Sequence, residues 1–510
     1  MNKLLLAFSL LLAAGNSTAQ SAEILAIRKV RTVSEHSWLK QYFSFLSIPN
    51  VADDESNIAR NAVRIMELMQ ERQIGNVQLL HPVTKGAPPA VFGEVKVPGA
   101  TKTIAFYAHY DGQPVDSTKW AAGFHPFKPV LIKNKVLHQS NIIPFPEEGQ
   151  PIDPEWRIVS RGSSDDKGGV LAILLAYEAL KQSGQTAGCN IKFFFEGEEE
   201  AGSPHLGEIL QQHKDLLNAD IWVICDGPVH QSGSKQISFG VRGDVNMDIV
   251  VYGSKRPLHS GHYGNWAPNP ALQLSRLLAS MKDEQGKVLI KGFYDDVIPL
   301  SAAEKKALAA VPKADAQLKK ELGFIRNEMP GTDLAESLLL PSLNINGIQS
   351  ANAGKLAANV IPLQAMATLD LRLVKGNDQQ VQQQRVVDHI KAQGYYVTTQ
   401  EPTEAERAQY PKIAQVITQE GYNAQRTSMD LPIAKDIAAA VQKTTAGKLI
   451  LVPSLGGSLP LFLFEKHLKV NTITVPLANH DNNQHAENEN IRLQNFWNGI
   501  ETMASIMMIR

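Results

Sequence analysis

The sequence predicts an α/β protein with a mostly parallel sheet and an inserted α+β domain. Three observations support this fold class. Short apolar runs rich in β-branched and aromatic residues recur in the first and last parts of the chain, helix-period segments separate them, and the middle of the chain alternates between apolar and polar residues. Alternating strand and helix patterns are typical of a parallel sheet that helices cover on both faces.

The α/β part accounts for both ends of the chain. Helix-period segments at residues 169–181 and 433–443 lie between short strand runs, and 510 residues suffice for more than one buried core. We therefore expect one domain built from residues 20–232 and 420–510. Its strand runs are residues 103–107, 191–195, 221–224, 449–452 and 472–475.

The middle of the chain has a different pattern. Residues 245–252 and 366–374 alternate like half-exposed antiparallel strands. This pattern predicts an α+β domain inserted at residues 233–419. Helical patterns lie between and after the two strands, at residues 270–281, 301–311 and 380–393.

The N-terminus has the order of a secretory signal peptide. Lys3 is followed by an apolar run at residues 4–14 and by small and polar residues up to Ala19. The run is too short to be a permanent membrane span. We expect residues 1–19 to be removed and the protein to be exported, either periplasmic or secreted.

The charge balance excludes two classes of partner. Fifty basic residues against 51 acidic ones give a formal net charge of -1, without the basic excess that binds nucleic acid or an anionic membrane. A small-molecule partner is therefore expected. Cys189 and Cys225 both flank apolar strand runs, which predicts two buried free thiols rather than a disulfide framework.

Polar side chains follow the predicted strands at the points where the strands end. His109 and Asp111 lie two residues apart after one such run, so the Asp111 carboxylate can orient the imidazole toward a metal. Each acid alone would be an ordinary helix cap or solvated charge, but open α/β sheets bind ligands at the carboxyl ends of strands. The shared placement therefore indicates one metal site. The other groups so placed are Asp165, Asp166, Glu198, Glu199, Glu200, Asp226 and His485.

These motifs resemble those of the M20 family of metallopeptidases and, within it, the carnosinase-like dipeptidases. The resemblance extends from about residue 36 to the C-terminus. It implies a catalytic domain with a dinuclear metal site, and an insert that acts as a lid and dimerisation domain. The matching segments are residues 108–114, 161–169, 196–203, 225–227, 258–261, 292–297, 359–362, 456–460 and 485–489.

The resemblance implies a set of metal ligands. Asp165 would bridge two divalent ions, with zinc expected first and manganese as the alternative, and the peptide bond from Asp165 to Asp166 would be cis. Three carboxylate ligands and two divalent ions leave about one positive unit by simple addition, which acidifies a bridging water. The other ligands would be His109 and Glu200, holding one ion each, and Asp226 and His485, completing the two shells.

The same resemblance implies catalytic and substrate-binding roles. Glu199 would be the general base, and Asp111 would support it by orienting a metal-binding histidine. His259 of the insert would reach the active site of the partner subunit in a homodimer paired through the lid domain. The residues that bind the free C-terminal carboxylate of the substrate would be Arg372, Asn359 and Ser458.

Some features leave alternatives open. Glu198 stands where the family usually has an apolar residue, so the assignments within residues 198–200 are open to a shift of one position. Residues 139–156, rich in proline and acid, are extra and are expected to form a surface loop near the mouth of the site. His480 competes with His485 as a ligand, but only His485 is followed by Asn-Glu at the family's spacing.

The resulting hypothesis is a dinuclear metal-dependent hydrolase that cleaves the amide bond of dipeptides or similar small peptides with a free C-terminal carboxylate. An N-acyl-amino-acid deacylase on the same scaffold is the nearest alternative, and a binding protein that has lost catalysis is the weaker one. A serine hydrolase is disfavoured because no Gly-x-Ser-x-Gly elbow occurs.

Overall fold

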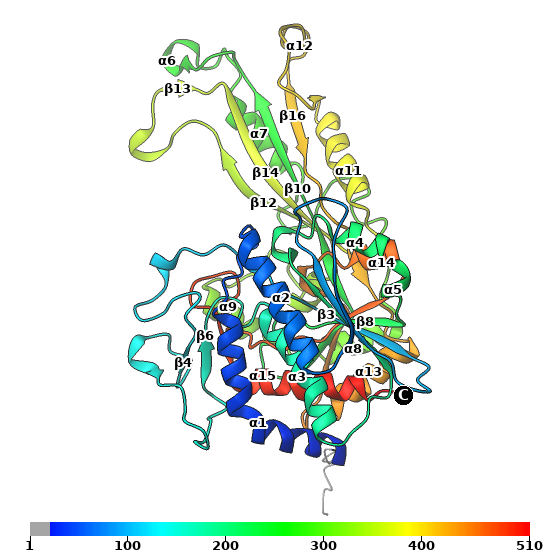
Figure 1. The fold of residues 1–510 in the computed structure, drawn as a ribbon. Helices are drawn as coiled ribbons and strands as arrows, with labels where there is room; N and C mark the ends of the chain where they lie inside the picture. Colours follow the sequence, from blue (N-terminus) through cyan, green and yellow to red (C-terminus); the bar gives the residue numbers. More distant parts are fainter. Residues whose placement is uncertain (1–20) are drawn as a thin grey trace, which may run out of the picture.

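The computed structural model describes residues 21–510 (Figure 1). Its largest element is an eight-stranded sheet in the order β1-β2-β7-β3-β8-β20-β9-β18. The neighbours β7, β3, β8 and β20 run parallel, while β1 and β2 extend one edge antiparallel. The mostly parallel α/β fold is confirmed. The strands are β1 (Gly75–Leu80), β2 (Ala90–Val95), β3 (Thr103–His109), β7 (Asn190–Glu196), β8 (Ile221–Ile224), β9 (Gln236–Ser238), β18 (Ile450–Val452) and β20 (Thr472–Thr474).

Helices cover both faces of this sheet because its strands are apolar on both sides. On β3, Ile104 and Phe106 join one hydrophobic core, whereas Ala105 and Tyr107 join the core on the opposite face, as the two-residue period of a strand requires. The helices of the first face are α1 (Ala22–Leu46), α2 (Glu55–Glu71), α3 (Lys167–Gln182), α13 (Pro432–Gln442) and α15 (Leu493–Met507). Those of the second are α4 (Leu206–Gln212), α5 (Lys214–Leu217) and α14 (Phe462–Leu468).

Helix α3 connects the buried core to the edge where the polar residues gather. It is apolar around most of its circumference, which is typical of a helix buried on all sides, and it packs between α1 and α15. The side chain of Asp166 caps its first turn by accepting from the Gly169 backbone N–H at 3.1 Å. A Cβ atom at Gly169 would collide with the Asp166 carboxylate and the Cys225 carbonyl, so only glycine fits there.

The insert forms a second layer around a long strand. Strand β10 continues from the central body into a sheet of order β12-β14-β10-β16-β15, and it also pairs with β17 and β19 near its start. Figure 1 shows this layer extending away from the central sheet, with α6 (Ser260–Tyr263) and α12 (Glu404–Gln409) at its far end. The strands are β10 (Gly240–Tyr252), β12 (Ser342–Gln349), β14 (Gln364–Leu373), β15 (Tyr396–Thr398), β16 (Ile413–Thr418), β17 (Gln425–Arg426) and β19 (Leu455–Ser458).

The strand and helix patterns predicted for the middle of the chain occur in this layer. Helices α7 (Pro270–Ala279) and α11 (Gln379–Ala392) pack on one face of its sheet around a separate hydrophobic core. The boundaries at residues 233 and 419 stay a prediction. The short elements at the outer part of the layer are β11 (Leu258–His259), α6 (Ser260–Tyr263), β13 (Val360–Ile361) and α12 (Glu404–Gln409).

One part of the insert packs away from its own sheet. Helix α8 (Ala302–Ala309) places Ala303 and Ala307 against the core of the central body, and Glu304 forms a buried ion pair with Arg426 at 3.0 Å. Two short helices follow, α9 (Asp315–Leu322) and α10 (Leu334–Ser337). The predicted helix at residues 301–311 is present, but its period did not reveal which domain it contacts.

The extra segment at residues 139–156 is largely an exposed surface loop, as expected, but it packs beside α1 rather than at the mouth of the site. It contributes β5 (Ile142–Ile143) to a small antiparallel sheet, and Phe145 makes edge-on ring contacts with His36 and Phe43 of α1. The other strands of that sheet are β4 (Val130–Ile132), β6 (Arg157–Val159) and β21 (Asn490–Arg492). The segment is held on the α1 side because its aromatic and aliphatic residues pack there.

Cys189 and Cys225 are free and buried, as expected. Within residues 21–510, none of the helices combines the length and the apolar character needed to cross a membrane. The predicted signal peptide at residues 1–19 lies outside the described residues.

Candidate active site

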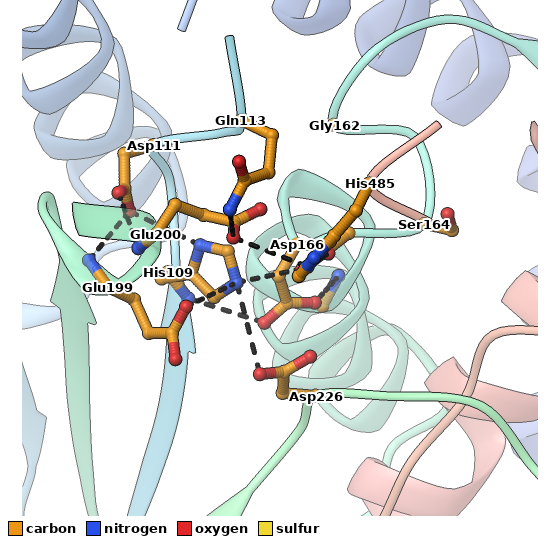
Figure 2. A network of polar contacts seen from close by, with 12 residues as sticks. His109, Asp111, Gln113, Gly162, Ser164, Asp166, Glu199, Glu200, Asp226 and His485 are labelled. Carbon is orange, nitrogen blue, oxygen red and sulfur yellow. Dashed lines mark hydrogen bonds and ion pairs between the residues drawn. The ribbon is translucent and has the colours of Figure 1, made fainter. Parts of the chain in front are cut away.

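The predicted polar residues gather at one edge of the central sheet (Figure 2). His109 is the last residue of β3, the glutamates at 198–200 follow β7, and Asp226 follows β8. These three strands are parallel neighbours, so their carboxyl ends meet. Two loops, those carrying Asp165 and His485, complete the cluster.

His109 is fully buried and held from both ring nitrogens. Its Nε2 lies 2.9 Å from Asp165 Oδ1, and its Nδ1 lies 3.2 Å from Asp111 Oδ1. The Asp111 carboxylate also accepts from the backbone N–H groups of Glu199 and Glu200, at 3.1 and 2.9 Å. Asp111 therefore fixes the orientation of the imidazole and ties it to the glutamate turn.

Asp165 lies between two groups of side chains. Its Oδ1 faces His109, and its Oδ2 lies 3.1 Å from His485 Nε2. Asp226 Oδ2 is 3.9 Å from His109 Nε2, whereas Glu200 Oε2 is 3.3 Å from His485 Nε2. Oδ1 of Asp165 thus faces the group formed by His109 and Asp226. Oδ2 faces the group formed by His485 and Glu200. The peptide bond following Asp165 is cis, as the resemblance implied.

The side chains near His109 form two overlapping sets of three candidate ligands. One set is His109, Asp165 and Glu200, and the other is His109, Asp166 and Asp226. The sequence placed Asp166 among the polar groups of the site, but the ligand set implied by the resemblance did not include it. Both of its oxygens are already used, because Oδ1 accepts from the Gly169 N–H at 3.1 Å and Oδ2 from the His109 N–H at 3.3 Å. Asp166 is better explained as a helix cap that also positions His109.

The donor set fits divalent cations. Asp226 Oδ1 is buried and has no hydrogen-bond partner among the described residues, and the nearest partner of the buried Asp165 Oδ2 is the His485 imidazole at 3.1 Å. Burial and the charge of Asp165 raise the pKa of Glu200 to about 8 and that of Asp226 to about 6. Crowded buried carboxylates with unpaired oxygens need positive charge nearby. Oxygen and imidazole donors are those that zinc and manganese accept.

The three consecutive glutamates have different surroundings. Glu198 accepts from the backbone N–H of His205 at 2.7 Å and lies 3.0 Å from its Nδ1, so its carboxylate is already bound. Glu199 Oε2 lies 3.9 Å from His109 Nε2, and burial raises the pKa of Glu199 well above its usual range. Glu200 lies within a candidate ligand set. The geometry therefore gives no support to a shift of one position.

Glu489 is a positioning residue that sequence reasoning did not single out. Its buried carboxylate accepts from the backbone N–H groups of Gly162, Ser164 and Asp165 at 2.8 to 3.0 Å, and from Arg161 Nη1 at 2.7 Å. One side chain thus shapes the loop that presents Asp165. Its place at the end of the matching segment 485–489 was the available signal.

A cavity of about 810 Å³ connects the cluster to residues of the insert. Arg372 and Ser458 both line it, and Arg372 Nη1 donates to Ser458 Oγ at 2.9 Å. The guanidinium also pairs with Asp370 at 3.0 Å and Asp244 at 3.3 Å. The structure therefore brings these two predicted substrate-binding residues to the cavity.

His259 and Asn359 do not reach the cavity of their own chain. Both are exposed and lie together at the outer end of the insert, where the Ser260 N–H donates to the Asn359 carbonyl at 3.0 Å. Figure 1 shows α6 and β13, the elements next to them, far from β3 and β8. A role for either residue in catalysis requires a second molecule or a large movement.

Comparison with known proteins adds relatives of similar length. The chain is 26% identical over 495 residues to the Cys-Gly metallodipeptidase DUG1 of Saccharomyces cerevisiae, covering 92% of this chain and 95% of that protein. It is 26% identical over 430 residues to the Beta-Ala-His dipeptidase of Homo sapiens, covering 82% and 77%. The structure of the M20 family metallo-carboxypeptidase Sso-CP2 from Sulfolobus solfataricus matches with a TM-score of 0.73 and 25% identity, covering 92% and 98%.

The predicted export is corrected by these comparisons. The yeast Cys-Gly metallodipeptidases that this chain matches over about nine tenths of its length are intracellular dipeptidases. The prediction of a periplasmic or secreted protein was therefore wrong. It depended on a short apolar run after one lysine, a compositional pattern that does not by itself decide where a protein is delivered.

The family assignment rests on the sequence and the site together. The profile of peptidase family M20/M25/M40 matches residues 105–509, which include every predicted metal ligand and the candidate base. Four of these ligands, His109, Asp165, Glu200 and Asp226, belong to the candidate ligand sets, and the exposed His485 lies against Asp165 at the cavity. This chain therefore belongs to peptidase family M20/M25/M40.

Proposed function

We propose that this protein is a dinuclear metal-dependent dipeptidase that hydrolyses the amide bond of dipeptides or similar small peptides with a free C-terminal carboxylate. One observation carries the proposal. The buried carboxylates of Asp165 and Asp226 line the same cavity as Arg372 and Ser458, and Asp226 Oδ1 has no hydrogen-bond partner among the described residues. A metal-binding cluster and a carboxylate-binding group thus face one space.

The proposed ligands divide into two groups around Asp165. His109 with Asp226 would bind one divalent ion and Glu200 with His485 the other, and Asp165 would be shared between the two. The distances of 2.9 and 3.1 Å from its two oxygens to the two histidines support a bridging position. We propose zinc as the physiological ion, with manganese as the alternative.

The side chains around the ligands would perform the proton transfers. Divalent ions held there would supply Lewis acidity toward a water molecule and the scissile carbonyl. Glu199 takes the proton of the attacking water and returns it to the leaving amine. Asp111 holds the Glu199 backbone and the His109 ring, so that base and ligand keep their relative positions.

Substrate length would be selected at the other end of the cavity. The planar guanidinium of Arg372 presents paired donors that suit a carboxylate, and Ser458 adds a hydroxyl. A substrate carboxylate would exchange with Asp370 and Asp244, which pair with Arg372 in the structure. The fixed spacing between this group and the metal cluster favours a short peptide.

A homodimer paired through the insert would complete the site. His259 and Asn359 are exposed at the outer end of the insert and outside their own cavity, a position from which a partner subunit could receive them. In this arrangement His259 donates to the oxyanion formed in the partner's site. Asn359 would contact the partner's substrate.

The experiment that tests the proposed function combines metal analysis with a substrate screen. Purified protein is stripped with a chelator, reloaded with zinc or manganese, and assayed against dipeptides, C-terminally amidated dipeptides and acetylated amino acids. Two ions per subunit and cleavage of free dipeptides are expected. Preference for acetylated amino acids would establish the deacylase alternative instead, and bound metal without hydrolysis of any small amide would leave a binding protein.

A further inference from the structure

One wall of the cavity is apolar and comes from the part of the insert that packs on the central body. Leu308, Val311, Leu318, Leu338 and Leu339 all line the cavity and are only half-buried. Within residues 21–510, none of them belongs to any of the hydrophobic cores. These side chains face open space, where an apolar group of a ligand would remove them from water.

This wall is fixed in place rather than loosely attached. Helix α8 is anchored by the buried ion pair of Glu304 with Arg426 at 3.0 Å. Helices α9 and α10 are joined because Asp315 Oδ1 accepts from the Leu334 backbone N–H at 3.0 Å. A wall held by these two contacts keeps its shape. It can therefore select a ligand by shape and polarity as well as exclude water.

The wall begins beside the group proposed to bind the substrate carboxylate. A Cβ atom on Gly456 would lie 2.9 Å from Leu338 Cδ2, and Gly456 is two residues from Ser458, which binds Arg372. Ser342, four residues after Leu338, lies opposite Arg372 in the pairing of β12 with β14. Leu338 thus approaches the strand that carries Ser458, and it lines the same cavity as Ser458 and Arg372.

The charged residues at this wall are already paired. Lys313 and Asp333 both line the cavity and form an ion pair at 3.3 Å. Asp315 accepts a backbone hydrogen bond, as described above. A charged substrate side chain would therefore meet leucine and valine side chains and ions that have partners, whereas an apolar one would gain contacts.

We propose that this wall binds the side chain of the C-terminal residue of the substrate and selects a bulky apolar residue there, of the size of leucine, methionine or phenylalanine. The inference rests on the proposed dipeptidase function, because it takes Arg372 and Ser458 as the carboxylate end. It names the substrate class as dipeptides whose second residue is large and apolar.

The first test uses the wild-type protein loaded with zinc. The kcat/KM for alanyl-leucine and alanyl-phenylalanine should exceed that for alanyl-glycine by about tenfold or more, since burying a side chain of this size is worth at least that factor. Alanyl-lysine should be poor, and leucyl-glycine should not share the advantage. Equal rates across this panel, or a preference that follows the first residue, would overturn the proposal.

A binding measurement tests the selectivity of the wall without turnover. The affinities of the same protein for free leucine and for free glycine are measured by calorimetry. If leucine binds about tenfold more tightly than glycine, the proposed selectivity of the wall is supported. This holds even if no dipeptide is cleaved, a result that would contradict only the proposed function. Equal affinity for the two amino acids overturns the wall even where dipeptides are cleaved.

Variants then locate the preference. Leu338→Ala and Leu318→Ala should each lower the leucine-to-glycine ratio of kcat/KM by about threefold to tenfold, because each removes apolar contact area. Leu338→Met keeps an apolar side chain of similar volume and should retain the ratio. Leu322→Ala is the matched control, since Leu322 is on the same helix as Leu318 but 69% exposed and outside the cavity. An unchanged ratio in the first two variants, with unfolding midpoints equal to wild type, contradicts the proposal.

Discussion

The metal cluster and the insert differ in how they hold their functional residues in position. In the cluster, Asp111, Asp166 and Glu489 each accept backbone N–H groups from neighbouring segments, and the residues they position are buried or half-buried. In the insert, His259 is exposed and Arg372 is paired with two aspartates.

This difference shows which part of the site is already formed before the substrate binds. The cluster has its geometry in the isolated chain, as preorganised electrostatic catalysis requires. The residues of the insert need a second event, either a partner subunit for His259 or an exchange of ion pairs for Arg372. Changes in the two regions should therefore have different kinetic consequences.

The largest expected effect is that of Glu199→Gln. Removing a general base costs about two to four orders of magnitude in kcat, while the metal content should remain because Glu199 is not a proposed ligand. Kinetics and metal analysis on the same sample measure both. Glu198→Gln is the matched control, since its carboxylate is bound by His205, and it should change kcat far less. Loss of metal in Glu199→Gln would show that the assignments at 198–200 are shifted.

The next effect tests whether the insert acts across subunits. His259→Ala should lower kcat by about two to three orders of magnitude if His259 donates to the oxyanion. Mixing His259→Ala with Glu199→Gln should restore about one quarter of wild-type activity, because half of the dimers are mixed and each has one complete site. Absence of rescue after subunit exchange, verified with differently tagged chains, would exclude the trans role.

Arg372→Lys should have a smaller effect that depends on the substrate. A lysine keeps the charge but loses the paired donors, which should cost about tenfold in kcat/KM for free dipeptides. C-terminally amidated dipeptides should be poor substrates of the wild type and should be little affected by the change. If the wild type cleaves free and amidated dipeptides equally well, Arg372 does not bind the carboxylate.

The smallest effect concerns the stability of the central body. Lys235 donates to Thr444 and Thr502 at 2.7 Å, and burial of its ammonium lowers its pKa from 10.5 to about 7. Between these values the folded protein binds fewer protons than the unfolded chain, so the contribution of Lys235 to stability rises with pH. Below pH 7 both states are protonated and the full cost of burial remains.

Comparison with Lys235→Met isolates this contribution. The unfolding free energy of the wild type relative to the variant should rise by about 1.4 kcal/mol per pH unit between pH 7 and 10. Denaturant titrations at several pH values measure the difference. A difference that stays flat, or that falls with pH, would show that the ammonium remains charged in the folded protein.

The sequence predicted the parts of the molecule that depend on local pattern. Strand ends at residues 109, 196 and 224 follow from apolar runs and their limits, and parallel neighbours bring those ends together. The side chains of His109 and Asp165 were therefore predictable as neighbours although they are 56 positions apart.

The remaining features depend on tertiary contacts that the hydrophobic periodicity of the sequence does not encode. The helical pattern at 301–311 shows which of its faces is apolar but not that Ala303 and Ala307 meet the central body. The acidic and proline-rich character of residues 139–156 suggested a loop near the site, whereas Phe145 anchors them on α1. Glu489 was one matching acid among several until its hydrogen bonds identified it as the support of the Asp165 loop.

The position of Glu489 in the chain has a consequence for biosynthesis. Synthesis reaches Glu489 325 positions after Ser164, and until then the loop at 161–165 lacks its organising carboxylate. His485 and helix α15, which packs against α3, also follow that loop late. Domains fold during synthesis as their residues become available. A nascent chain that has not yet reached these residues therefore has no finished cluster, and the cluster is completed when they join a body that has already formed.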